Sequence, residues 1–298
     1  MEKKKYYQGI LCLVVASLLW GTTGTAASFL PQVNALAIGA MTMSLGGVLL
    51  AYRSRRSISA DKSRLRQHNK TVLIGALCVF TYPLAFYLSM RLSGVAIGTV
   101  ISIASAPFFS AVLDYVISKQ VISRRWWGAF LLGGAGVFLL CVPSSQQLDA
   151  QSSNAFGVGL ALVAGLSYAG YTKAGKRLMD AQISSSSAMA SMFLVAAFLL
   201  LPTLWFTGEG LSIQWQTVGV LIYLGVIPMF VGYVLFGQGL SVMPASQVTL
   251  ITLLEPVIAA VLAVCIVGEH LGIRGTLGVV MVILCILVQS RQKSTMSD

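Results

Sequence analysis

One apolar pattern occurs twice in this chain, once in each half. Residues 96–117 (AIGTVISIASAPFFSAVLDYVI) align with residues 245–266 (ASQVTLITLLEPVIAAVLAVCI), at an offset close to half of the 298-residue length. The identical pairs are Ala96/Ala245, Pro107/Pro256, Ala111/Ala260, Val112/Val261, Leu113/Leu262 and Ile117/Ile266. Membrane proteins built from internal repeats have this pattern, and their sites form between the copies. The repeat therefore predicts two related membrane units around a shared site.

The composition is that of a membrane protein. Apolar residues make up 56% of the chain and charged residues 10%, well below the quarter that is typical of soluble domains. A helix of about 20 apolar residues can cross a bilayer. The first apolar run is too long for a secretory signal, so we expect it to be an uncleaved helix. We expect ten spans, at residues 8–30, 32–52, 71–90, 94–117, 126–142, 156–176, 187–207, 216–239, 244–267 and 271–290.

A polar segment divides these spans into two equal groups. Residues 143–155 read as a linker between a first five-helix repeat at 1–142 and a second at 156–298. An odd number of spans in each repeat inserts the second copy upside down relative to the first. The predicted fold class is an all-α integral membrane protein with ten transmembrane helices in two inverted five-helix repeats.

The distribution of basic residues explains the net charge of +11. Of the 20 Lys and Arg residues, only Arg91 and Arg274 fall on one side of the expected spans, and all the others fall on the opposite side. This is the positive-inside bias, and it predicts that both termini lie in the cytoplasm. The basic excess therefore reports orientation in a lipid bilayer, and no nucleic-acid partner is expected. The short connections are typical of the bacterial cytoplasmic (inner) membrane.

No metal or cofactor is expected. The five cysteines lie inside predicted spans without CxxC spacing, and His68 and His270 have no ligand partners nearby. The chain has no GxxxxGK[ST] loop, so it does not hydrolyse ATP. It also lacks an HExxH motif, paired intramembrane aspartates and a Ser/His set. An intramembrane enzyme is therefore a disfavoured alternative.

Helix-breaking residues occur at similar depths in five spans. Each lies about ten to twelve residues into its helix, which is about 16 Å deep and near the middle of a bilayer core of about 30 Å. Proline leaves a backbone carbonyl unpaired, which is tolerated in a membrane where protein or a wet cavity satisfies it. A central cavity is favoured over ordinary kinking. The positions are Trp20-Gly21, Pro83, Pro107, Pro228 and Pro256.

These features resemble a known group of membrane proteins. Trp20-Gly21, the Pro107 and Pro256 segments, and Gly268-Glu269 after the ninth span are similar to the drug/metabolite transporter superfamily, in particular its EamA family of ten-helix bacterial exporters. The resemblance implies an inverted-repeat carrier with a pocket lined by spans one, three, four, six, eight and nine. Members typically export amino acids or related small metabolites. Gln120 and Lys173 depart from the family pattern.

Two charged residues in the spans are candidates for function. Glu255 lies near the midplane, where a charge costs at least about 2.5–3.5 kcal/mol, so it suits substrate binding, cation binding or proton coupling. Its structural alternative is to cap the carbonyls freed by Pro256. The stem of Lys173 either snorkels to the cytoplasmic interface, or its ammonium binds a substrate carboxylate or pairs with Glu255. Asp114 is expected at the interface.

Aromatic and hydroxyl side chains at the same depth complete the predicted site. They suit a small amphipathic solute, although each alone could equally pack between helices. The predicted substrate-binding residues are Trp20, Thr23, Tyr82, Ser105, Tyr168, Tyr171, Lys173, Tyr233, Thr252 and Glu255.

The leading hypothesis is a secondary carrier that works by alternating access, with protons as the candidate coupling ion. A nucleotide-sugar or sugar-phosphate carrier of the same superfamily is the alternative. It ranks lower because phosphates require several buried basic residues and only Lys173 qualifies. The oligomeric state, monomer or dimer, stays open.

Overall fold

The computed structural model describes residues 2–141, 155–208, 211, 214–267 and 272–290. Within these ranges every regular element is helical, as the predicted all-α class requires. Gly268-Glu269, His270 and all of the expected linker except Ala155 lie outside the described residues.

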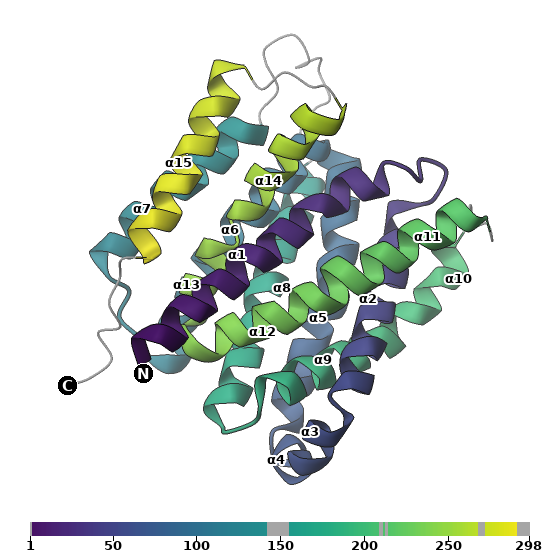
Figure 1. The fold of residues 1–298 in the computed structure, drawn as a ribbon, viewed down its shortest axis with the longest axis vertical. Coiled ribbons are helices and arrows are strands. Elements are labelled where there is room, and N and C mark those ends of the chain that lie inside the picture. The colour runs from purple at the N-terminus through teal and green to yellow at the C-terminus, as the bar shows by residue number, and fades with distance from the viewer. Residues whose placement is uncertain (1, 142–154, 209–210, 212–213, 268–271, 291–298) are drawn as a thin grey trace.

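The helices follow one another with short connections (Figure 1). In the first half they are α1 (Glu2–Ala27), α2 (Ala35–Arg53), α3 (Arg55–Ala60), α4 (Lys62–Gln67), α5 (Asn69–Ser93), α6 (Val95–Ser118) and α7 (Arg124–Cys141). In the second half they are α8 (Ala155–Asp180), α9 (Ser185–Leu200), η1 (Leu201–Thr203), α10 (Leu204–Thr207), α11 (Trp215–Leu224), η2 (Gly225–Val231), α12 (Gly232–Val242), α13 (Ala245–Ile251), α14 (Leu254–Leu262), η3 (Ala263–Val267) and α15 (Ile273–Ser290).

Eight helical stretches in the described part of the chain are long and apolar enough to cross a membrane. They coincide with eight of the ten expected spans. The fifth expected span is α7, which begins with Arg124-Arg125. The tenth is α15, whose apolar part, Ile273–Gln289, is shorter than the other eight. The protein is therefore a multi-span helical membrane protein, and the count of ten spans stays a prediction.

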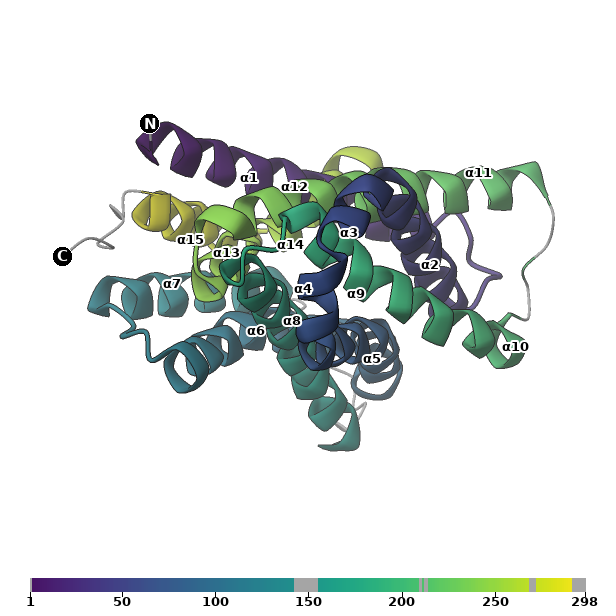
Figure 2. The same ribbon diagram turned by 90° about the horizontal axis from the view of Figure 1, so that it is seen from below.

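Helices from the two halves of the sequence pack against each other throughout the bundle. The pairs are α5 with α8, α2 with α9, α1 with α12 and α14, and α7 with α15. Figures 1 and 2 show α7 and α15 side by side at one edge of the molecule. Neither half forms a separate globule, so a cavity at the centre is bounded by both.

Glycines allow α7 and α15 to approach closely. A Cβ atom on Gly136 would lie 2.9 Å from the backbone oxygen of Gly278, and one on Gly278 would lie 2.6 Å from that of Gly136. Helices in lipid associate through such small residues, because van der Waals packing replaces the hydrophobic effect there. These two glycines therefore hold α7 and α15 in close contact.

Two prolines interrupt the regular hydrogen bonding near the centre of the bundle. Pro256 has no N–H, and the carbonyl of Thr252 instead accepts the backbone N–H of Glu255 at 3.0 Å, which breaks the ninth span into α13 and α14. Pro228 lies in the π-helical turn η2, where the N–H of Gly232 donates to Ile227, five residues back. Both irregularities adjoin the cavity described below.

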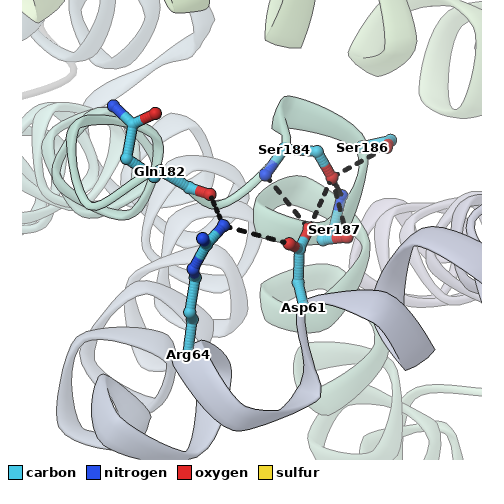
Figure 3. A network of polar contacts seen from close by, with 6 residues as sticks. All are labelled: Asp61, Arg64, Gln182, Ser184, Ser186 and Ser187. Atoms are coloured by element: carbon cyan, nitrogen blue, oxygen red, sulfur yellow. Dashed lines mark hydrogen bonds and ion pairs between the residues drawn. The ribbon is translucent and has the colours of Figure 1, made fainter.

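A polar network joins the short helices α3 and α4 to the turn between α8 and α9 (Figure 3). Asp61 accepts hydrogen bonds from the backbone N–H of Ser184 at 3.1 Å and from its hydroxyl at 2.8 Å. Arg64 lies 3.9 Å from Asp61 and donates to the backbone oxygen of Gln182 at 2.7 Å. Burial alone raises the pKa of the Asp61 carboxyl, but hydrogen bonds from Ser184 and Ser187 and the charge of Arg64 outweigh it, so the pKa lies below its ordinary value.

Candidate functional site

A pocket lies at the centre of the bundle, between α1, α2, α5, α8, η2–α12 and α14. Its empty volume is about 610 Å³, with the part open to solvent included. Its walls come from both halves of the sequence. The lining residues are Trp20, Thr23, Gly39, Thr42, Met43, Tyr82, Pro83, Phe86, Tyr87, Tyr168, Tyr171, Met229, Tyr233 and Glu255.

Trp20 fixes the position of α1 against the irregular eighth span. Its indole N–H donates to the backbone oxygen of Pro228 at 2.9 Å, within η2. A Cβ atom on Gly232 would lie 2.7 Å from the indole nitrogen, so glycine is needed there for the ring to fit. The adjacent Gly21 plays the matching part toward α14, since a Cβ on it would lie 2.6 Å from Ile258. The Trp-Gly pair thus seats α1 between two helices of the second half.

Tyrosines on three helices form a continuous aromatic wall. Tyr168 and Tyr171 stack on α8 with ring centroids 5.2 Å apart, and Tyr82 on α5 lies 5.7 Å from Tyr168. The hydroxyls of Tyr171 and Tyr233 are 3.3 Å apart, within hydrogen-bonding distance. Tyr233 also packs on Trp20, with centroids 4.9 Å apart. These rings are held by one another, which makes this wall preorganised.

Thr252 lies outside the pocket and holds Tyr168 in place. Its hydroxyl donates to the backbone oxygen of Thr249 at 3.0 Å and lies 2.7 Å from the hydroxyl of Tyr168. Because the Thr252 proton is directed to Thr249, Tyr168 is the donor in the second bond. Thr252 therefore positions a pocket residue and does not itself line the pocket.

Glu255 brings the acidic group to the pocket. It lies in the first turn of α14, where the helix dipole favours a negative charge. Its carboxyl makes no hydrogen bond or ion pair with any described residue, although its backbone N–H bonds to Thr252. The structural alternative for this residue was to cap a carbonyl freed by Pro256. The backbone of Glu255 does this, and the side chain faces the pocket.

Lys173 and Asp114 form a buried ion pair away from the pocket. The ammonium of Lys173 donates to Asp114 at 2.5 Å and to the hydroxyl of Ser118 at 2.7 Å. The other oxygen of Asp114 accepts the backbone N–H of Ser246 at 2.9 Å, at the start of α13. The exposed fractions of the Lys173 and Asp114 side chains are 6% and 1%.

This pair corrects two expectations. Lys173 does not snorkel to the interface and does not pair with Glu255, and Asp114 is buried instead of interfacial. The physical reason is that each charge satisfies the other, so neither has to reach water. Lys173 is not among the residues that line the pocket.

Seven of the ten predicted binding residues line the pocket, and three do not. Those outside are Lys173, Thr252 and Ser105, whose hydroxyl donates to the backbone oxygen of Ser102 at 3.3 Å on α6. None of the lining residues comes from α6, the fourth expected span, whereas α2, the second, contributes three. The seven are Trp20, Thr23, Tyr82, Tyr168, Tyr171, Tyr233 and Glu255.

Sequence reasoning missed several lining residues, among them Thr42 on α2 and Phe86 and Tyr87 on α5. Tyr87 had a usable signal, because it lies about one turn beyond Tyr82 and Pro83 on the same helix. Thr42 had a weaker one, since it is one of two hydroxyl residues, with Ser44, at mid-depth in a span without a proline. Its hydroxyl bonds back to Ile38 at 2.7 Å.

The fold and the pocket define a polytopic helical membrane protein with a central, partly polar cavity. The sequence matches the EamA-like transporter family twice, over residues 7–142 and again over residues 155–291. The chain therefore belongs to the EamA-like transporter family and is a membrane transporter.

Relatives with similar sequences extend over nearly the whole chain. It is 34% identical over 288 residues to "Uncharacterized transporter YwfM" of Bacillus subtilis, with 94% of this chain and 93% of that protein covered. It is 22% identical to "Uncharacterized inner membrane transporter YicL" of Salmonella typhimurium, with 95% of each covered. A solved crystal structure is similar in fold, with a TM-score of 0.78 at 17% identity and 94% of this chain and 95% of the other covered.

Proposed function

We propose that this transporter is a secondary carrier that moves a small solute through the central pocket by alternating access. The observation that carries the proposal is the pocket itself, which is bounded by helices from both family-matching halves and contains one carboxyl without a protein partner in the described part of the chain. Sites between repeats near the middle of the membrane are typical of such carriers. The proposal includes the inverted arrangement of two five-helix repeats, at 1–142 and 156–298.

The two ends of the bundle differ, which supports an alternating mechanism. The pocket residues of α1, Trp20 and Thr23, lie near the end of that helix, and those of α2 begin at Gly39, near its start. The pocket is therefore displaced toward the end of the bundle where α1 passes into α2. The ion pair of Lys173 with Asp114 lies toward the opposite end and ties α6 to α8 and α13. In the proposed cycle these contacts hold that end closed and separate when it opens.

The charge distribution gives the orientation that belongs to this proposal. Most Lys and Arg residues lie at the end of the bundle that carries the ion pair, so this end faces the cytoplasm of a bacterial cell and both termini lie there. In this orientation the pocket lies nearer the end of the bundle that faces away from the cytoplasm. Export of an amino acid or a related metabolite is the direction and solute class that the family resemblance implies.

The alternative of a nucleotide-sugar or sugar-phosphate carrier has less support. Phosphate groups are bound by Arg and Lys side chains, and the residues that line the pocket include neither. Among the described residues that line the pocket, the only charged group is the carboxyl of Glu255, which repels phosphate.

Counterflow in proteoliposomes tests the carrier function. Vesicles with the purified protein are loaded with an unlabelled solute and diluted into the labelled form, over a panel of amino acids and amines. A carrier gives transient, trans-stimulated uptake of at least one solute, and Asp180→Asn, at an exposed residue outside the pocket, serves as the matched control. Uptake that equals that of empty vesicles for every solute would refute the proposal.

A further inference from the structure

The pocket has an unusual balance of aromatic surface and charge. Of the described residues that line it, half are aromatic, one is a glutamate, and none is Lys, Arg or His. A ligand that enters this pocket meets ring faces and one carboxyl, and the described lining offers no basic side chain to an anionic group.

The carboxyl of Glu255 lacks a compensating charge from the protein. The one buried lysine ammonium in the described spans is committed to Asp114, at 2.5 Å. A carboxylate at this depth is costly unless a positive charge or a proton offsets it. The position of Glu255 in the first turn of α14 contributes a partial positive charge, which favours the ionised form without neutralising it.

The aromatic rings of the pocket divide into a buried group and a partly exposed group. Trp20, Tyr168, Tyr171 and Tyr233 are each at most 5% exposed and lock one another in place. Tyr82, Phe86 and Tyr87 lie on two successive turns of α5 and line the pocket. They are only half-buried, so parts of these three side chains are free to meet a ligand. The face of an aromatic ring attracts a cation, with about 0.5–2 kcal/mol for each ring.

We infer that the pocket binds a monovalent organic cation, a protonated amine with an apolar or aromatic body, whose nitrogen lies against Glu255 and whose body packs on Tyr82, Phe86 and Tyr87. This inference rests on the proposed carrier function and, within its solute class of amino acids and related metabolites, selects an amine over a free amino acid. An amine satisfies the free carboxyl and gains from the ring faces. A free amino acid would in addition bury its own carboxylate without a basic partner, which is unfavourable.

Three ligands that share a phenyl ring on a two-carbon chain and differ in their ionised groups test this inference. Phenethylamine is a cation at neutral pH, phenylalanine carries an additional carboxylate, and 3-phenylpropanoate has only the carboxylate. Binding to the purified protein in lipid nanodiscs is measured by isothermal titration calorimetry. We expect phenethylamine to bind about tenfold more tightly than phenylalanine or better, and 3-phenylpropanoate not to bind. A tenfold ratio corresponds to about 1.4 kcal/mol.

Variants separate the charge from the rings. Glu255→Gln keeps the shape and is expected to weaken phenethylamine binding about tenfold or more, whereas the control Asp180→Asn leaves it unchanged. Tyr82→Leu is expected to weaken it about fivefold, and Tyr82→Phe, which keeps a ring, to weaken it less. Equal binding of phenylalanine and phenethylamine, full affinity in Glu255→Gln, or no binding of phenethylamine overturns the inference.

Counterflow of the same three ligands tests the organic-cation site and the carrier function separately. Trans-stimulated uptake of phenylalanine or 3-phenylpropanoate without uptake of phenethylamine would refute the organic cation and keep the carrier. Tight binding of phenethylamine with no counterflow of any solute would keep the cation site and refute the carrier.

Discussion

The ammonium of Lys173 lies 2.5 Å from a carboxylate oxygen of Asp114, and both side chains are almost completely buried. Asp114 belongs to the first family-matching half and Lys173 to the second. Through its other oxygen Asp114 also holds the first turn of α13, by way of Ser246. The desolvation cost of a buried pair can exceed its Coulombic gain. We therefore infer that the ion pair mainly holds α6, α8 and α13 in their arrangement and adds little net stability.

Removal of one partner of this pair should destabilise the protein strongly. Lys173→Met leaves the Asp114 carboxylate buried and uncompensated, and we expect a loss of about 3–5 kcal/mol in the free energy of unfolding. Thermal or denaturant unfolding in detergent micelles measures it. Asp180→Asn, which removes the exposed partner of Lys176, should cost about 1 kcal/mol or less.

The double variant Lys173→Met with Asp114→Leu provides the internal check. Because neither charge then remains, its loss should be much smaller than the sum of the two single losses. Additive losses would show that the pair does not act as a unit.

Trp20 should contribute through its indole N–H as well as its ring. Trp20→Phe removes the donor to the Pro228 carbonyl, which leaves a polar atom unsatisfied, and we expect a loss of about 1–3 kcal/mol. Trp205, which is 90% exposed, is the matched control, and Trp205→Phe should leave the unfolding midpoint unchanged. If both variants unfold at the wild-type midpoint, the hydrogen bond to Pro228 has no energetic role.

The sequence was sufficient for the all-α membrane class, the family and much of the cavity lining, whereas the ten spans and the inverted repeat stay predictions. Trp20, Tyr82, Tyr168, Tyr171, Tyr233 and Glu255 are polar or aromatic residues at mid-depth in otherwise apolar helices, and several adjoin a helix breaker. Such residues are expensive to expose to lipid, so they gather where the helices meet. The depth of a residue in its span and its polarity can both be read from the sequence alone.

What sequence reasoning could not supply is the identity of partners across the bundle. Lys173 and Asp114 are 59 positions apart, and each alone looks like a residue near a membrane interface. Their pairing depends on the contact of α6 with α8. Thr42 was missed for a similar reason, because only the packing of α2 beside the pocket gives it a role.

Glu255 should couple solute movement to protons. The wild-type carboxyl can take up and release a proton in turn with the solute, so an imposed pH gradient should accelerate solute accumulation in proteoliposomes. Glu255→Gln cannot exchange a proton, and its residual transport should be indifferent to the gradient. If the gradient accelerates transport equally in both proteins, the coupling group is another residue. Exchange of the solute without a gradient serves as the control that the variant is intact.

Asp61 should stabilise the connection between α4 and the start of α9 in a pH-dependent manner. Its pKa is lower in the folded protein than in the unfolded chain, where the pKa of an aspartate is about 3.9. The contribution to stability is therefore complete above the unfolded pKa and is lost as the pH falls through the folded pKa. We expect Asp61→Asn to lower the free energy of unfolding by about 1 kcal/mol at neutral pH, because a charged acceptor for Ser184 becomes a neutral one. Thermal unfolding of both proteins between about pH 3 and pH 7 measures the difference, which should shrink toward the acid end of the range. A difference that is constant across it would mean that Asp61 acts through the shape of its side chain and not through its charge.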